Sequence, residues 1–122
     1  MVDDEPAVRT LVARALEAHG HMVRMAAHGA EALGLCTTAP AAFDCVITDV
    51  RMPVMDGWEL GRKLRERWPN LPILYISAFD TEVSDRRQRA SRASGFLQKP
   101  FDREELLERV MELIERNPRY DT

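Results

Sequence analysis

Two short, mainly apolar runs separated by an amphipathic stretch constrain the fold of this chain more than any other feature of its sequence. Residues 43–48 and 72–77 have the composition of buried strands, as in parallel sheets that are covered on both faces. Between them, a helix is predicted whose buried stripe is Leu60, Gly61, Leu64 and Trp68 and which Pro69 ends. A strand, a helix and a second strand in this order predict a parallel sheet.

Helical periodicity also marks the first and last parts of the chain. In the first segment, apolar residues spaced by three and four positions predict a buried face made of Val8, Leu11, Val12, Ala15 and Leu16. Pro6 suits the first turn of this helix and Gly20 its end. In the last segment, the expected buried face is Leu107, Val110, Met111 and Ile114, with Asp102 as the N-cap.

Weaker segments complete the alternation of strands and helices. Residues 21–26 and 96–98 are predicted to be short strands, whereas residues 29–38 and 81–94 are predicted to be helices. We therefore expect a single α/β domain over residues 1–122, with helices on both sides of a parallel sheet.

The overall charge gives no general attraction to nucleic acid or to an anionic membrane. The chain has 122 residues and a net charge of −3, so no excess of positive charge draws it to a polyanion. An arginine-rich stretch, with Arg86, Arg87, Arg89 and Arg92, follows several acidic residues. We interpret it as the solvated face of a helix and expect no direct nucleic-acid contact.

A cytoplasmic location is expected from the cysteines and from hydropathy. Cys36 and Cys45 form no C-x-x-C pair and have no metal-ligand histidine near them in sequence, so both are predicted to be small core residues of a reducing compartment. No apolar run approaches the roughly 20 residues of a membrane span, and no signal-peptide pattern is recognised, so we expect no membrane contact.

Acidic residues follow the predicted strands at the positions where strands of a parallel sheet end. Asp3 and Asp4 follow the first apolar residues, Asp49 follows the run at 43–48, and Lys99 follows the last strand. The carboxyl ends of such strands converge at the ligand crevice of an open α/β sheet. Clustered carboxylates repel one another unless a cation neutralises them. This pattern predicts a site for Mg²⁺ and a phosphoryl group.

The motifs together resemble the receiver domain of two-component response regulators over essentially the full chain. The matching pieces are Val2-Asp3-Asp4-Glu5, Asp49 with Met52-Pro53 and Asp56-Gly57, Ser77-Ala78, and Lys99-Pro100-Phe101. The resemblance implies a flavodoxin-like, doubly wound sheet of five parallel strands in the order 2-1-3-4-5 with five flanking helices. The family normally has about four apolar residues before the acidic pair, so the first strand is expected to be shortened.

The same resemblance implies a role for each site residue. Asp49 corresponds to the phosphoacceptor, and Lys99 to the cation that reaches a phosphoryl oxygen. Ser77 and Phe96 correspond to the hydroxyl and aromatic members of a conformational switch, although a buried strand phenylalanine is also compatible with plain core packing. The expected Mg²⁺ ligands are Asp3, Asp4, Asp49 and the backbone carbonyl of Arg51. A cis bond between Lys99 and Pro100 is also implied.

The partners implied are a histidine kinase or a histidine phosphotransfer protein, and a homodimer through the face of the fourth helix, fifth strand and fifth helix. The output is left open, because a stand-alone domain and a part of a hybrid histidine kinase or larger regulator are both compatible with the sequence. One alternative is a pseudo-receiver that acts only through protein contacts.

Two further alternatives are disfavoured by single sequence features. An aspartyl-nucleophile phosphatase would need a second aspartate at the position of Arg51. A flavodoxin-like cofactor module would need a glycine-rich loop where Asp3 and Asp4 stand. We therefore expect a signalling domain, not a metabolic enzyme, that catalyses only its own phosphorylation and slow dephosphorylation.

The shortened first strand predicts a measurable loss of stability. Each missing buried side chain forgoes about 1.5–3 kcal/mol. Adding about three or four apolar residues before Met1 should therefore raise the melting temperature, as followed by circular dichroism. An unchanged melting temperature would reject the explanation.

Overall fold

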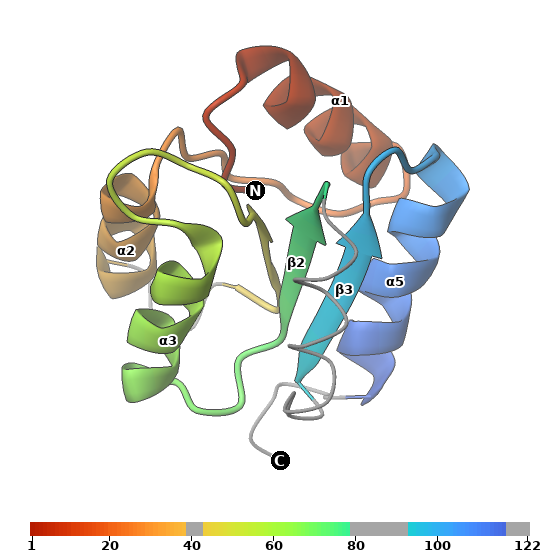
Figure 1. Cartoon of the computed structure of the whole chain (residues 1–122). Coiled ribbons are helices and arrows are strands. Elements are labelled where there is room, and N and C mark those ends of the chain that lie inside the picture. Colours follow the sequence, from red (N-terminus) through yellow and green to blue (C-terminus); the bar gives the residue numbers. More distant parts are fainter. Residues whose placement is uncertain (39–42, 79–92, 117–122) are drawn as a thin grey trace.

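Three parallel strands form the centre of the fold in the computed structural model, which describes residues 1–38, 43–78 and 93–116. The strands are β1 (Val46–Asp49), β2 (Ile73–Ser77) and β3 (Ser94–Gln98), paired in the order β1-β2-β3. Asp49 pairs with Ile76, and Ser77 pairs with Gln98. The carboxyl ends of all three strands therefore lie at the same end of the sheet (Figure 1).

The beginning of the chain extends this sheet beyond β1. Val2 forms parallel bridges to Thr48 on one side and to Ala26 on the other. The sheet order is therefore residue 26, residue 2, β1, β2, β3, which agrees with the predicted connectivity 2-1-3-4-5 and with a shortened first strand.

The prediction of a strand over residues 21–26 is wrong in extent. Only Ala26 forms a bridge, and its N–H donates to the carbonyl of Met1 (2.9 Å). The reason is that Ala26 pairs beside the first residues of the chain, so residues 21–23 have no strand next to them among the described residues. A ladder needs backbone partners as well as a favourable sequence.

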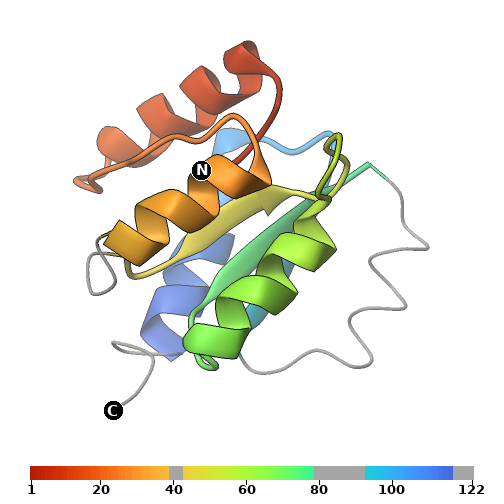
Figure 2. The ribbon, with the colours of Figure 1, turned by 90° about the vertical axis from the view of Figure 1, so that its left-hand side faces the viewer.

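Helices cover both faces of the sheet (Figures 1 and 2). Helices α2 (Gly29–Thr38) and α3 (Gly57–Arg67) pack on one face, where Ile73 and Tyr75 point. Helices α1 (Pro6–Glu17) and α5 (Arg103–Arg116) pack on the other face, against Leu74 and Ile76. This alternation along β2 produces two separate hydrophobic clusters, and it explains why the strand is apolar at successive positions.

The buried faces of α1 and α5 differ in part from the predicted ones. Leu11 in α1 is 67% exposed and Met111 in α5 is 44% exposed, so the prediction that both are core residues is wrong. The buried residues of α5 are Leu106, Val110 and Leu113, with Leu107 and Ile114 at the flanks of the contact. The buried face of α5 is therefore turned relative to the predicted one, toward Leu106 and Leu113, which the prediction did not include.

The predicted helix ends agree better with the structure. Pro6 opens α1, and Gly20, with φ +87°, follows its end. The Asp102 carboxylate accepts a hydrogen bond from the N–H of Glu105 (2.8 Å) at the start of α5. Trp68 forms the C-cap of α3, one residue beyond the helix.

The predicted helix over residues 81–94 falls almost wholly outside the described residues. Its last residue, Ser94, begins β3 in the structure, so that strand starts earlier than predicted. No helix of the described ranges has the length and the apolar character needed to cross a bilayer.

Gly61 provides a test of the packing between α3 and β2. A Cβ at this position would overlap the hydroxyl of Tyr75, so Gly61→Ala should destabilise the fold by about 1–3 kcal/mol although alanine favours helices. Gly34→Ala in α2, where a Cβ meets nothing within 4 Å, should instead stabilise it by roughly 0.5–1 kcal/mol. Urea unfolding measures both changes. Adding Tyr75→Phe should recover part of the loss, and an additive double variant would contradict the overlap.

Candidate functional site

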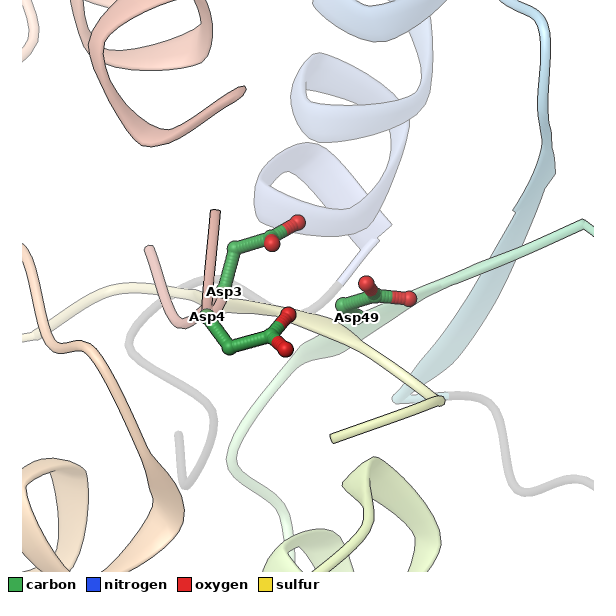
Figure 3. Close-up of side chains that lie close together, drawn as sticks. All are labelled: Asp3, Asp4 and Asp49. Atoms are coloured by element: carbon green, nitrogen blue, oxygen red, sulfur yellow. The ribbon is translucent and has the colours of Figure 1, made fainter. Parts of the chain in front are cut away.

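Three carboxylates lie close together at the carboxyl end of β1, beside the segment that leads into α1 (Figure 3). One carboxylate oxygen from each of Asp3, Asp4 and Asp49 lies within 4.8 Å of the other two. Strand pairing produces this cluster, because the N–H of Asp49 donates to the carbonyl of Val2 (2.9 Å) and so fixes Asp49 beside Asp3. The predicted convergence of these three residues is therefore seen in the structure.

Asp3 is the most constrained member of the cluster. It is fully buried, and its Oδ1 accepts a hydrogen bond from the N–H of Glu5 (2.9 Å). Its Oδ2 is buried without a hydrogen-bond partner among the described residues. Burial, with a smaller contribution from Asp49, raises the pKa of Asp3 from 3.8 to about 6. An unpaired buried oxygen is costly, so a cation at this point would remove an unfavourable feature of the fold.

This donor set fits Mg²⁺ by its chemistry. All three side chains offer hard carboxylate oxygens, and Mg²⁺ is usually bound by one or two carboxylates together with water. Asp4 is exposed while Asp3 and Asp49 are buried, so the cluster is open to solvent on one side. The backbone carbonyl of Arg51 stays a predicted ligand.

Lys99 supplies the positive charge of the site. Its Nζ lies 3.2 Å from Oδ2 of Asp49, whose side chain is 6% exposed. The backbone N–H of Lys99 donates to the carbonyl of Ser77 (2.8 Å) and ties the ends of β2 and β3 together. The predicted cis bond between Lys99 and Pro100 is confirmed. The ion pair is partly buried, so solvent screens it less than it screens a surface pair.

The predicted switch residues lie in β2, which pairs with the strand of Asp49, and in β3, the next strand of the sheet. Ser77 is fully buried at the end of β2, directly after the residue that pairs with Asp49. Phe96 is buried in β3, with its ring centroid 5.8 Å from that of Tyr75 and stacked on it. The switch roles of Ser77 and Phe96 stay predictions.

Two residues that support the site were not assigned from the sequence. The guanidinium of Arg9 donates to the backbone carbonyl of Asp3 (2.7 Å) and holds the acidic segment against α1. At Gly57, a Cβ would overlap the backbone carbonyl of Asp49 and come within 2.9 Å of Cα of Val50. The Asp56-Gly57 pair stood out as a motif, but only the structure shows that Gly57 packs on the Asp49 backbone.

Comparison with known proteins decides the family. The family model of the response regulator receiver domain matches residues 1–111. The chain belongs to the response regulator receiver family. Response regulator MprA of Mycobacterium sp. (strain KMS) is 42% identical over 117 residues, which are 95% of this chain and 50% of that protein. Sensor kinase CckA of Brucella abortus (strain 2308) is 38% identical over 116 residues, which are 95% of this chain and 12% of that protein.

Solved receiver structures confirm the flavodoxin-like fold. The chemotaxis protein CheY4 of Vibrio cholerae superimposes with a TM-score of 0.82 at 35% identity, covering 92% of this chain and 93% of that one. The receiver domain of the hybrid histidine kinase CckA gives a TM-score of 0.76 at 38% identity, covering 92% and 94%. The chain thus corresponds to the receiver portion of longer proteins such as MprA and CckA.

The raised pKa of Asp3 predicts an unusual pH dependence of stability. A carboxyl whose pKa rises from 3.8 to about 6 on folding binds more protons in the folded state between these values. Its contribution to stability therefore falls as the pH rises through this window. We expect Asp3→Asn to lack this loss when divalent ions are absent, so its advantage over wild type should grow as the pH rises.

Urea unfolding over this pH range, with EDTA present, measures the difference between the two proteins. Adding Mg²⁺ should raise the stability of the wild type more than that of the variant. A constant gap between the two proteins at all pH values would contradict the assignment of a protonatable, buried Asp3.

Proposed function

We propose that this receiver domain accepts a phosphoryl group from a phosphohistidine onto Asp49, with Mg²⁺ bound, and thereby controls an output partner. The observation that carries the proposal is the setting of Asp49 at a strand end, between the carboxylates of Asp3 and Asp4 and the ammonium of Lys99. Phosphoryl transfer needs a positioned nucleophile and positive charge that neutralises the phosphoryl oxygens. A carboxylate beside a cation-binding cluster can meet both requirements.

In the proposed step, a carboxylate oxygen of Asp49 attacks the phosphorus of the phosphohistidine. An O–P bond forms as the N–P bond breaks, and the imidazole nitrogen leaves with the electron pair and takes up a proton from solvent. Lys99, already 3.2 Å from the Asp49 carboxylate, is placed to pair with a phosphoryl oxygen of the product. The backbone N–H of Lys99 donates to the carbonyl of Ser77, so the two residues are neighbours at the end of the sheet. The hydroxyl of Ser77 is proposed to donate to the same phosphoryl group.

The cation is assigned to Asp3, Asp4, Asp49 and the backbone carbonyl of Arg51. A bound Mg²⁺ would offset the negative charge that the carboxylates and the equatorial phosphoryl oxygens share. The Oδ2 of Asp3, which has no hydrogen-bond partner in the described part of the chain, supports this proposal, because burial alone makes the ionised form of Asp3 unfavourable.

The proposed output is a change of the surface near Ser77 and Phe96. A phosphoryl group on Asp49 would attract the Ser77 hydroxyl, and the ring of Phe96 in the neighbouring strand would repack in response. Phe96 has no hydroxyl, so its packing against Tyr75 determines which orientation is stable. The pairing of Ser77 with Gln98, two residues after Phe96, supports a direct connection between the two positions.

A histidine kinase or a histidine phosphotransfer protein is the proposed donor, since receiver domains of this family interact with histidine kinases. A homodimer is proposed through the face of the fourth helix, β3 and α5, although that helix lies outside the described residues. The matched relatives are longer than this chain, which spans half of the response regulator MprA and 12% of the sensor kinase CckA. A stand-alone receiver, a hybrid histidine kinase and a larger regulator are all compatible with the proposed output.

The main alternative is a pseudo-receiver that binds partners without being phosphorylated. The joint presence of Asp49, Lys99 and the acidic pair in contact distance favours phosphorylation. The two readings differ in one measurable property, the covalent uptake of phosphate.

The proposal is tested by incubating the chain with a small phosphodonor such as phosphoimidazole and recording its intact mass. We expect one added phosphoryl group that requires Mg²⁺ and is absent from Asp49→Asn, because the amide cannot act as the nucleophile. Glu66→Gln, which removes an exposed carboxylate of α3, is the matched control and should be phosphorylated like wild type. Uptake that persists in Asp49→Asn would refute the acceptor, and a folded wild type without uptake would favour the pseudo-receiver.

A further inference from the structure

Arg9 reaches back from α1 to the acidic segment that precedes the helix. Its Nη1 donates to the backbone carbonyl of Asp3 at 2.7 Å, a short bond of the kind that a charged donor forms. The backbone N–H of Arg9 donates to the carbonyl of Glu5 (3.1 Å). No ion pair joins Arg9 to a carboxylate in the described part of the chain. Arg9 therefore holds the acidic segment without binding a carboxylate oxygen.

The carbonyl that Arg9 binds belongs to the peptide group between Asp3 and Asp4. A peptide group is planar, and the Cα atoms of both flanking residues lie in its plane. Fixing this carbonyl therefore restricts how the two carboxylate-bearing residues are turned relative to each other. Both side chains extend to the side on which Asp49 lies (Figure 3), and one oxygen of each carboxylate is within 4.8 Å of the others. Arg9 thus acts on two predicted cation ligands at once.

Asp4 depends on this bond more than Asp3 does. Asp3 is also held through its N–H and its Oδ1, whereas Asp4 is exposed and its side chain forms no hydrogen bond within the described ranges. Val2 forms the last sheet bridges before this segment, and α1 begins at Pro6 without a side-chain cap. The direction of the Asp4 carboxylate is therefore set by its backbone, and so by the peptide group that Arg9 holds.

We propose that Arg9 is a positioning residue for the divalent cation and that it gives the site its preference for Mg²⁺ over Ca²⁺. The inference rests on the proposed function, because it concerns the cation ligands assigned there. Mg²⁺ is small and requires near-ideal octahedral geometry, whereas Ca²⁺ accepts a larger and looser set of oxygen ligands. Groups that hold metal ligands from outside commonly contribute about tenfold or more to affinity. A rigidly held acidic pair therefore favours the ion that tolerates less misplacement.

The charge of Arg9 and its hydrogen bond have opposite effects on cation binding. A guanidinium near the cluster repels a divalent ion, so loss of the charge alone should strengthen the binding of both Mg²⁺ and Ca²⁺. Loss of the hydrogen bond should weaken binding, and that of Mg²⁺ more than that of Ca²⁺. The sign of the change therefore separates positioning from electrostatics.

Calorimetric titration with MgCl₂ and with CaCl₂, at constant ionic strength and without a phosphodonor, measures both dissociation constants. Arg9→Met keeps the apolar stem and the helix propensity but removes the donor. It should raise the Mg²⁺ dissociation constant about tenfold and the Ca²⁺ constant less than about threefold. Arg9→Lys keeps the charge on a shorter side chain without the planar fork, so it should change the Mg²⁺ constant in the same direction.

Arg14→Met is the matched control, because it removes the same charge from an exposed position of α1 and should leave both constants as in wild type. Mg²⁺ binding by Arg9→Met that is as tight as in wild type, or tighter, would overturn the inference. An equal loss for both ions would overturn it as well. Wild type that binds Mg²⁺ but takes up no phosphoryl group would refute the proposed function and leave the role of Arg9 standing. Wild type that binds no Mg²⁺ would refute both.

Discussion

The backbone hydrogen bonds of Val2 are the interaction on which the candidate site depends. Its N–H donates to the carbonyl of Ile47 (2.8 Å), and its carbonyl accepts from the N–H of Asp49 (2.9 Å). The next residue, Asp3, is therefore held beside Asp49. Because strand side chains alternate between faces, a slip of one residue in this pairing would turn the carboxylates apart. The site is thus a consequence of strand register, and the two hydrophobic clusters maintain that register.

Within the described ranges, the positive side chains do not balance the negative charges that this register brings together. Lys99 pairs with Asp49, whereas Asp3 has no cation of its own and keeps one oxygen unpaired among the described residues. Burial is the main cause of the raised pKa of Asp3, and the neighbouring Asp49 carboxylate adds to it. The helices pack on both faces of the sheet, α1 and α5 on one and α2 and α3 on the other. The stability from this packing offsets the free-energy cost of the buried carboxylates. Local unfavourable electrostatics of this kind are expected where a site must bind a cation and a phosphoryl group.

Sequence reasoning succeeded where one local pattern determines the structure. The central strands and α3 followed from apolar runs that need cover on both sides, and the meeting of Asp3, Asp4 and Asp49 followed from their positions at strand ends. It failed over residues 21–26, because strand formation there depends on partner groups that a distant segment must supply.

The burial of individual side chains was predicted less well than the positions of the helices. Periodicity gives the direction of a helix face only approximately, and it does not give the width of the surface that covers it. Leu11 and Met111 were therefore placed in the core although both are exposed. The overlap that a Cβ at Gly57 would cause is equally invisible in sequence, since it depends on how closely α3 approaches β1.

The aromatic packing between α3 and the sheet connects the candidate site to the predicted switch. The ring of Trp58 lies 4.6 Å from Tyr75 and 6.3 Å from Phe96, centroid to centroid. Trp58 directly follows Gly57, which has no room for a side chain against the Asp49 backbone. Interiors are packed too tightly for one ring to move alone. A displacement of Phe96 therefore requires Tyr75 and Trp58 to repack, and Trp58 belongs to the helix that begins on the Asp49 backbone.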